Sequence, residues 1–242
     1  MIIEVCIDSV QSAINAQQAG AARVELCDNL FEGGTTPSAG TIAVTRKQIS
    51  IGLQVIIRPR GGDFLYTDLE MEIMKKDILT AKELGVDGVV IGILTSEGRV
   101  DTKRCAVLVE LSRPMNVTFH RAFDMTQDPF SALEAIIDLG CERLLTSGQQ
   151  RTAIEGKELI AQLQEKAAGR IIIMPGGGVD EYNIDQMAAC GVEECHVSVR
   201  KSIRSGMDYQ NQRAFMGGEL RLPEYEMKVA DPERLSKITG RK

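Results

Sequence analysis

IIEVCI at residues 2–7 is the first of eight short apolar or β-branched stretches that decide the fold of this 242-residue chain. The other seven are RVELCD at 23–28, LQVIIRPR at 53–60, GVVIGI at 88–93, NVTFHR at 116–121, RLLTSG at 143–148, RIIIMPG at 170–176 and ECHVSV at 194–199. Their starts lie 21 to 35 residues apart. This spacing suits strand–helix units and is too long for the hairpins of an all-β protein.

Amphipathic stretches that stop at a glycine lie between these strands. They are 9–19 before Gly20, 68–84 before Gly85, 129–139 before Gly140 and 180–190 before Gly191. Glycine is the usual residue after a helix, and near-continuous apolar strands are typical of a parallel sheet covered by helices. Eight such units predict a (β/α)8 (TIM) barrel. The alternative, an open doubly wound sheet, lacks the GxGxxG motif after the first strand.

The last unit is irregular. We expect one domain, residues 1–242, in which residues 200–230 form a long loop or arm and residues 231–239 form a terminal helix introduced by Asp231-Pro232. A long loop after a barrel strand lies on the functional face and usually has a function. We therefore expect the 200–230 segment to be a lid or a dimerisation arm.

The composition excludes several classes of function. The formal net charge is −6 and the Lys and Arg residues are scattered, which argues against a nucleic-acid or anionic-membrane binder. No apolar run approaches the roughly 18 residues of a membrane span, and the first strand-like stretch lacks the basic and apolar regions of a signal peptide, so we expect neither feature. We predict a cytoplasmic protein whose six cysteines are free thiols and whose partners are small molecules, ions or protein.

Polar residues interrupt the strands that should fill the barrel. Alternation places Glu4, Cys6 and Asp8 on one face of the first strand, and Glu25 and Cys27 together on the second. The third strand ends in Arg58 and Arg60, and we expect the two arginines to balance the two glutamates. Such a network either fills the barrel as buried ion pairs or converges at the strand ends as a functional site.

Cysteines 6 and 27 form a candidate metal site. The two strands share the pattern Glu-x-Cys, so a similar register brings the thiols together. Two soft sulfurs suit Cu(I), with Met174 or His120 as candidate extra ligands. We expect His196 to be a core histidine with its hydrogen bonds satisfied. The remaining cysteines are expected to pack as small apolar residues: 105, 141, 190 and 195.

Glycine-rich turns suggest a second kind of site. Ser147-Gly148 follows the sixth strand, and Gly176-Gly177-Gly178 follows the seventh and precedes a predicted helix. Backbone N–H groups there are the usual phosphate cradle of this fold, and Arg58 and Arg60 would add anion contacts. This alternative is an enzyme acting on a small phosphorylated or anionic compound. In it His120 would act as acid and base together with Glu4 or Glu25.

Taken together, these motifs resemble the CutC copper homeostasis family. The motifs are EVC at 4–6, VELCD at 24–28, GGTTPS at 33–38, RPRGGDF at 58–64, FHRAFD at 119–124, LTSG at 145–148 and PGGG at 175–178. The resemblance implies a cytoplasmic (β/α)8 barrel that oligomerises, often as a dimer, and an association with copper. In eukaryotic members Cu(I) binding is attributed to two cysteines that match Cys6 and Cys27. The resemblance brings no demonstrated reaction.

Overall fold

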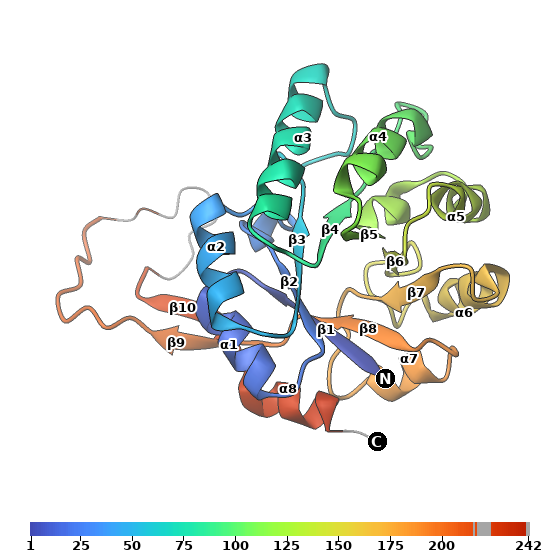
Figure 1. Cartoon of the computed structure of the whole chain (residues 1–242). Coiled ribbons are helices and arrows are strands. Elements are labelled where there is room, and N and C mark those ends of the chain that lie inside the picture. Colours follow the sequence, from blue (N-terminus) through green and yellow to red (C-terminus); the bar gives the residue numbers. More distant parts are fainter. Residues whose placement is uncertain (215, 217–223, 241–242) are drawn as a thin grey trace.

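The computed structural model describes residues 1–214, 216 and 224–240. Eight parallel strands form one sheet in the order β7-β6-β5-β4-β3-β2-β1-β8, and β7 lies beside β8, so the barrel is nearly closed (Figure 1). The strands are β1 Ile2–Ile7, β2 Arg23–Leu26, β3 Gly52–Ile56, β4 Gly88–Ile91, β5 Asn116–Phe119, β6 Arg143–Thr146, β7 Ile172–Pro175 and β8 Glu194–Val197. The predicted TIM-barrel fold is confirmed.

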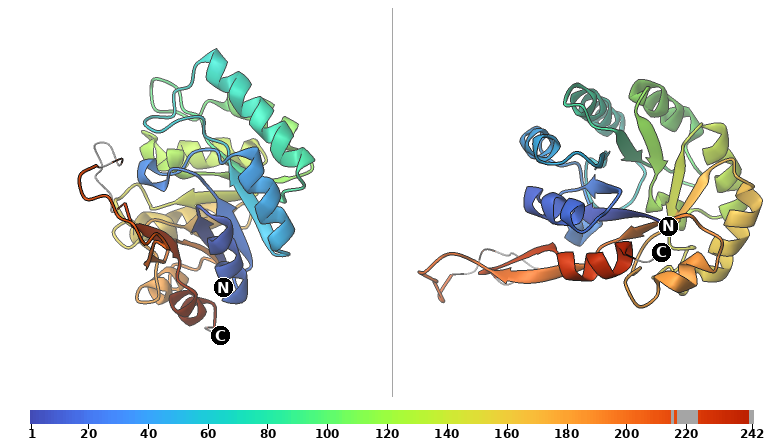
Figure 2. Two further views of the ribbon diagram at one scale, coloured as in Figure 1. Left: turned by 90° about the vertical axis from the view of Figure 1, so that its left-hand side faces the viewer. Right: turned by 60° about the horizontal axis from the view of Figure 1, so that its bottom comes forward.

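Helices surround the sheet, as the second view in Figure 2 shows. They are α1 Val10–Gln18, α2 Ala39–Gln48, α3 Asp68–Glu83, α4 Thr102–Ser112, α5 Pro129–Asp138, α6 Lys157–Ala167, α7 Ile184–Ala188 and α8 Pro232–Thr239. The side chains of Asp128 and Asp231 cap α5 and α8, each ahead of a proline at the first turn, as the sequence predicted for α8. Helix α7 is much shorter than the predicted 180–190 stretch because a turn replaces its first residues.

The strand register places the polar residues of the barrel. Glu4 of β1 lies between Arg23 of β2 and His196 of β8, and Cys6 lies beside Glu25. Residues that are aligned in neighbouring parallel strands point to the same side of the sheet. Inside the barrel, the charged layer of Glu4, Arg23 and His196 therefore lies next to a layer with Cys6 and Glu25. We call the first the lower layer, because it lies nearer the amino ends of the strands.

The segment after β8 is not wholly a loop. Residues Arg200–Arg204 (β9) and Glu226–Ala230 (β10) pair as antiparallel strands, and residues 215 and 217–223 of the predicted 200–230 segment lie outside the described part. The pair projects from the barrel next to α1 (Figures 1 and 2). The Ser12 hydroxyl accepts from the Ala230 N–H, and Asn15 donates to the Ala230 carbonyl. The two bonds attach the base of an arm to the barrel.

Membrane insertion by a helix finds no support in the described residues, since none of their helices combines the length and the apolarity that a span requires.

Candidate metal centre

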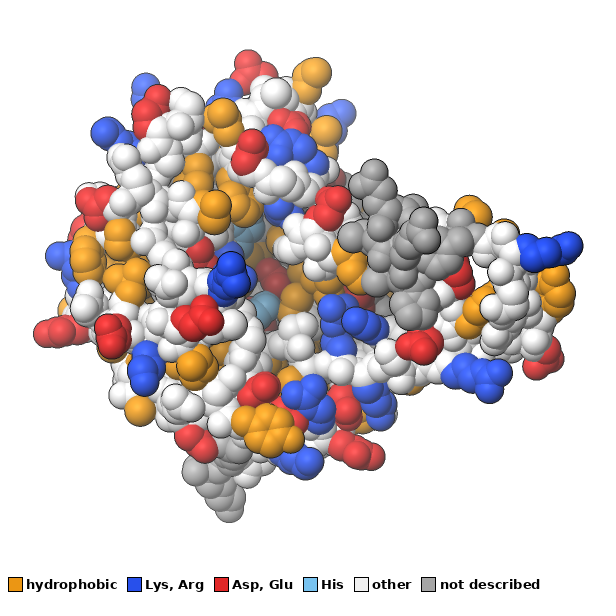
Figure 3. Space-filling model, turned by 180° about the vertical axis from the view of Figure 1, so that it is seen from behind, with side chains coloured by type: hydrophobic (Ala, Val, Ile, Leu, Met, Phe, Trp, Pro, Cys, Tyr) orange, Lys and Arg blue, Asp and Glu red, His pale blue; other side chains and the backbone are white. Residues whose placement is uncertain are grey.

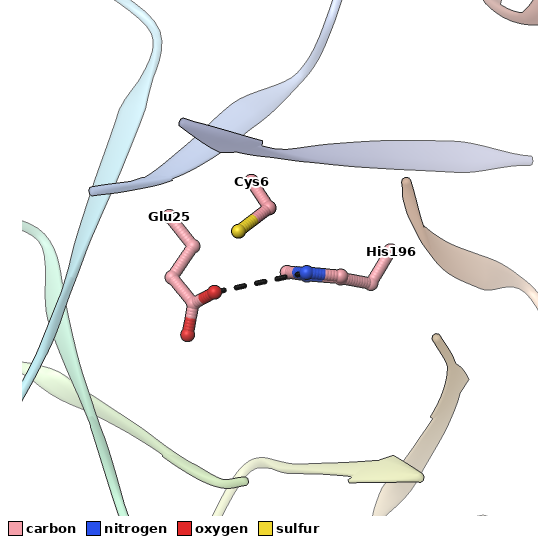
Figure 4. A group of neighbouring side chains, drawn as sticks. All are labelled: Cys6, Glu25 and His196. Carbon is pink, nitrogen blue, oxygen red and sulfur yellow. Dashed lines mark ion pairs between the residues drawn. The ribbon is translucent and has the colours of Figure 1, made fainter. Parts of the chain in front are cut away.

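Three side chains from neighbouring strands converge inside the barrel. They are Cys6 of β1, Glu25 of β2 and His196 of β8, and their ligand atoms all lie within 4.8 Å of one another (Figure 4). The Nε2 atom of His196 lies 3.7 Å from Oε2 of Glu25. His196 was expected only as a core histidine. Its place in this group is a functional feature that the sequence did not predict.

Cys27 adds a second sulfur. It follows β2 directly, and its Sγ lies 3.9 Å from Sγ of Cys6 and 3.5 Å from Oε2 of Glu25. The register aligns Cys6 with Glu25 rather than with Cys27, so the sulfurs meet on a diagonal. The predicted proximity of the two cysteines is nevertheless observed. All six cysteines are free thiols, as expected.

A charged network supports the group from below. Glu4 accepts a hydrogen bond from Arg23 Nε at 2.5 Å, and its other oxygen lies 2.8 Å from Nδ1 of His196. Arg23 also contacts Glu194, which binds Arg143 at 2.9 Å. A carboxylate on one ring nitrogen fixes the orientation of a ligating histidine. The network therefore aims Nε2 of His196 toward Glu25.

This network corrects the expected charge balance. Arg23, and not Arg58 or Arg60, pairs with Glu4, since Arg23 is the Cα partner of Glu4 in the β1–β2 register. The alternation of residues 23, 25 and 27 along the second strand could have revealed this cation. The expected cations, Arg58 and Arg60, lie at the end of the predicted third strand, whereas the observed one lies at the start of β2.

The pKa values of the two thiols are shifted in opposite directions. The hydrogen bond from Cys27 lowers the pKa of Cys6 to about 5 against the effect of burial, helped by His196. The same bond, with burial, raises the pKa of Cys27 well above its usual value. Burial opposes a charge on His196, but Cys6 and Glu4 raise its pKa well above the usual value. Cys6 and His196 thus form a thiolate–imidazolium pair.

The two glutamates carry opposite shifts. Burial alone would raise the pKa of Glu4, but its bonds to His196 and Arg23 hold the pKa near 2. Burial raises the pKa of Glu25 to about 8. Glu4 is therefore ionised at neutral pH, while Glu25 largely keeps its proton and can donate it. A pair of acids whose pKa values differ this much is common at functional sites.

The candidate centre offers two sulfurs, one nitrogen and one oxygen as donors, from Cys6, Cys27, His196 and Glu25. Soft thiolates with imidazole suit Cu(I). Cys6 already carries a thiolate, so binding there needs no proton to leave that sulfur. The donor set thus fits a soft ion.

The other predicted metal ligands lie elsewhere. Met174 of β7 accepts a contact of 3.0 Å from Arg23 and so belongs to the lower network. His120 follows β5, and its Nδ1 accepts a hydrogen bond from the Ala122 N–H. Burial, with the nearby Arg58 charge, lowers the pKa of His120 to about 3. His120 is therefore neutral at physiological pH, which does not suit the predicted acid–base role.

The two predicted anion-binding arginines differ from each other. Arg58 is 4% exposed and donates to the carbonyls of Glu32, Gly34 and Gly62. It therefore ties the loop after β2 to the loop after β3. Arg60 instead forms surface ion pairs with Asp63 and Glu70, so its charge is already balanced away from the thiols.

The serine of the predicted phosphate cradle already has hydrogen-bond partners. The Ser147 hydroxyl and N–H contact Asp124, and Arg121 donates to the same hydroxyl at 2.7 Å. The glycines 176–178 precede a turn rather than a helix, because α7 begins only at Ile184. The helix N-terminus expected to support an anion is therefore not at these glycines.

A cavity of about 320 Å³ opens above the thiol. Cys6, Glu25 and His196 line its floor side, with Arg58, Phe64 and His120 among the other lining residues. Figure 3 shows histidine side chains at the bottom of a hollow on this face of the molecule. The candidate centre is thus buried but adjacent to a route from solvent.

Comparison with known proteins places this arrangement in a family. The model of the CutC family matches residues 1–201. The chain belongs to the CutC family. A mouse relative described as a copper homeostasis protein cutC homolog is 52% identical over 240 residues, which cover 99% of this chain and 88% of the relative. A CutC family protein of Bacteroides fragilis is 52% identical over 236 residues, which cover 97% and 94% of the two chains.

Solved structures agree with the CutC assignment. A CutC crystal structure from Streptococcus agalactiae matches with a TM-score of 0.78 and 39% identity, covering 81% of this chain and 97% of the other. An aldolase called QR15 has a TM-score of 0.64 at only 12% identity, with 82% and 89% covered. The second likeness shows a shared barrel fold and nothing about activity.

Proposed function

We propose that this protein takes part in copper homeostasis by binding Cu(I) through Cys6 and Cys27, with His196 as a nitrogen donor. The observation that carries the proposal is the Sγ–Sγ distance of 3.9 Å. Metal–thiolate bonds are about 2.3 Å long, so one ion can contact both sulfurs with little movement. The names of the mouse and human relatives support a role in copper homeostasis.

The charge states support the same proposal. The Cys6 thiolate provides one anionic donor, and both Cys27 and Nε2 of His196 lose a proton when the ion arrives, while Nδ1–H of His196 stays on Glu4. Oε2 of Glu25 lies 3.5 Å from Sγ of Cys27, but Glu25 holds its own proton at neutral pH, so the protons released on metal binding pass to solvent. Burial of both sulfurs favours a soft, weakly hydrated ion over a hard one.

The cellular setting is part of the proposal. Six free thiols suit a reducing compartment, so we place the protein in the cytoplasm. The arm formed by β9 and β10 suits assembly into a homodimer or a higher homo-oligomer. The enzyme alternative has less support, because His120 is neutral and the glycine turn does not begin a helix.

Competition with a chromophoric Cu(I) chelator tests the metal site. The reduced, metal-free protein should withdraw one ion per chain, and X-ray absorption should show sulfur donors with nitrogen. The Cys6→Ser, Cys27→Ser double variant should lose at least 100-fold in affinity, whereas Cys190→Ser, which changes a partly exposed thiol after α7, should not. Equal affinity of the double variant and the unmodified protein would overturn the proposal.

A further inference from the structure

The cavity above the thiols contains a buried hydrogen-bond donor that the proposed copper site does not use. The Nε2 atom of His120 is buried and has no hydrogen-bond partner among the described residues. Since Nδ1 accepts from the Ala122 N–H, the ring proton of neutral His120 is on Nε2. An N–H donor without an acceptor is costly inside a protein. A ligand oxygen at this position would satisfy it.

The ring is held in place rather than loosely packed. A side chain on Gly92 would bring its Cβ to 2.5 Å from both Nδ1 and Cε1 of His120, so only glycine leaves room for the ring. Phe64 covers His120 with ring centroids 5.1 Å apart. The Nε2–H donor of His120 therefore has a fixed position in the wall of the cavity, beside the apolar surface of Phe64.

The same wall carries an unbalanced cation. The guanidinium carbon Cζ of Arg58 lies 5.1 Å from the centroid of the Phe64 ring, and the guanidinium donates hydrogen bonds to three neutral carbonyls. Asp124, which also lines the cavity, is occupied by Arg121, Thr146 and Ser147. The Arg58 charge forms no ion pair with a carboxylate in the described part of the chain, and next to a free N–H donor it complements an anionic oxygen group.

We propose that this cavity binds a small organic carboxylate, with one oxygen on Nε2 of His120, its charge facing Arg58 and its apolar part against Phe64. A carboxylate fits better than phosphate, because two lining residues, His120 at Nε2 and Arg58 at Nε, each carry a buried donor without a partner among the described residues, beside an aromatic face and not a nest of backbone N–H groups. The volume of about 320 Å³ suits a molecule of roughly ten non-hydrogen atoms. This site does not require copper.

Benzoate is the probe for this proposal. Calorimetry on the metal-free, reduced protein should show one benzoate per chain, bound at least tenfold more tightly than benzamide, acetate or inorganic phosphate. In an ¹⁵N-histidine-labelled sample, benzoate should shift the Nε2 proton of His120, and the spectrum without ligand should show the Nε2–H tautomer. Equal binding of benzamide, or no shift at His120, would overturn the proposal.

Variants sharpen the test. His120→Leu should weaken benzoate binding at least tenfold, and His120→Gln, which keeps an N–H donor at similar reach, should recover part of it. Arg60→Gln is the matched control, because Arg60 faces Asp63 and Glu70 instead of the cavity. Cys27→Ser changes a residue that does not line this cavity, so it should weaken Cu(I) binding and keep benzoate, and the two proposals fail separately. Unchanged affinity in His120→Leu would also contradict the carboxylate site.

Discussion

Nδ1 of His196 lies 2.8 Å from Oε1 of Glu4, although 191 residues separate them along the chain. Because β1 closes against β8, the first and the last barrel strands build one unit: a carboxylate, an imidazole and, beyond it, a thiol. The ionised Glu4 stabilises the charge on His196, and that charge stabilises the Cys6 thiolate.

Alkylation should reveal the Cys6 thiolate. In the metal-free protein, the rate of Cys6 modification by iodoacetamide should rise with pH through a midpoint near 5, because its hydrogen bond from Cys27 and the His196 charge lower its pKa. His196→Asn should raise the midpoint by at least one pH unit. Mass spectrometry of the labelled peptide gives the rate, and Cys190 serves as an internal reference. A midpoint near 9 in the unmodified protein would contradict the assignment.

Substitution of two glycines distinguishes the effect of backbone strain on stability from an effect on Cu(I) binding. Gly34 has φ +90°, and a Cβ there would lie 3.2 Å from Sγ of Cys27; Gly85 has φ +73° and open space around it. Alanine at either position should cost on the order of 1 kcal/mol of stability. Only Gly34→Ala should lower the Cu(I) affinity, by roughly tenfold, since it displaces the sulfur. Chelator competition and thermal unfolding measure the two effects, and equal affinities in both variants would refute the prediction.

Removal of Arg23 should destabilise the barrel strongly. Its loss in Arg23→Met leaves Glu4 and Glu194 buried without their shared cation, and such a broken pair costs about 3–5 kcal/mol. The control is Arg170→Met, which removes an exposed ion pair with Glu134 and should cost about 1 kcal/mol or less. Urea unfolding at neutral pH measures both free energies. A small loss for Arg23→Met would show that the network does not stabilise the fold.

The raised pKa of Glu25 predicts that the stability of the protein falls as the pH rises. The pKa of Glu25 is about 8 in the folded chain, compared with the usual value of 4.5 for a glutamate. The folded state therefore holds the proton more tightly than the unfolded state. The stability due to this group is complete below pH 4.5 and is lost as pH rises toward 8. Unfolding free energies of the unmodified protein, taken relative to Glu25→Gln, should therefore fall across this window. A constant difference between the two proteins would show that Glu25 does not titrate as described.

The sequence by itself determined the barrel and the identity of the two thiols. Strand-like stretches at regular spacing, with glycine after the helices, are local signals, because each strand or helix is encoded by its own residues. The repeated Glu-x-Cys pattern also indicated that Cys6 and Cys27 would meet. This worked because neighbouring parallel strands keep a similar register.

The partners of those thiols were decided by the tertiary structure. His196 joins Cys6 only because the sheet curves until β8 pairs with β1, and Arg23 balances Glu4 only in the register that this closure sets. Burial then gives Glu4 and Glu25 opposite charge states, although they are the same residue type. The residue order names the groups, but their distances and the loss of water around them, which set the chemistry, arise from three-dimensional packing.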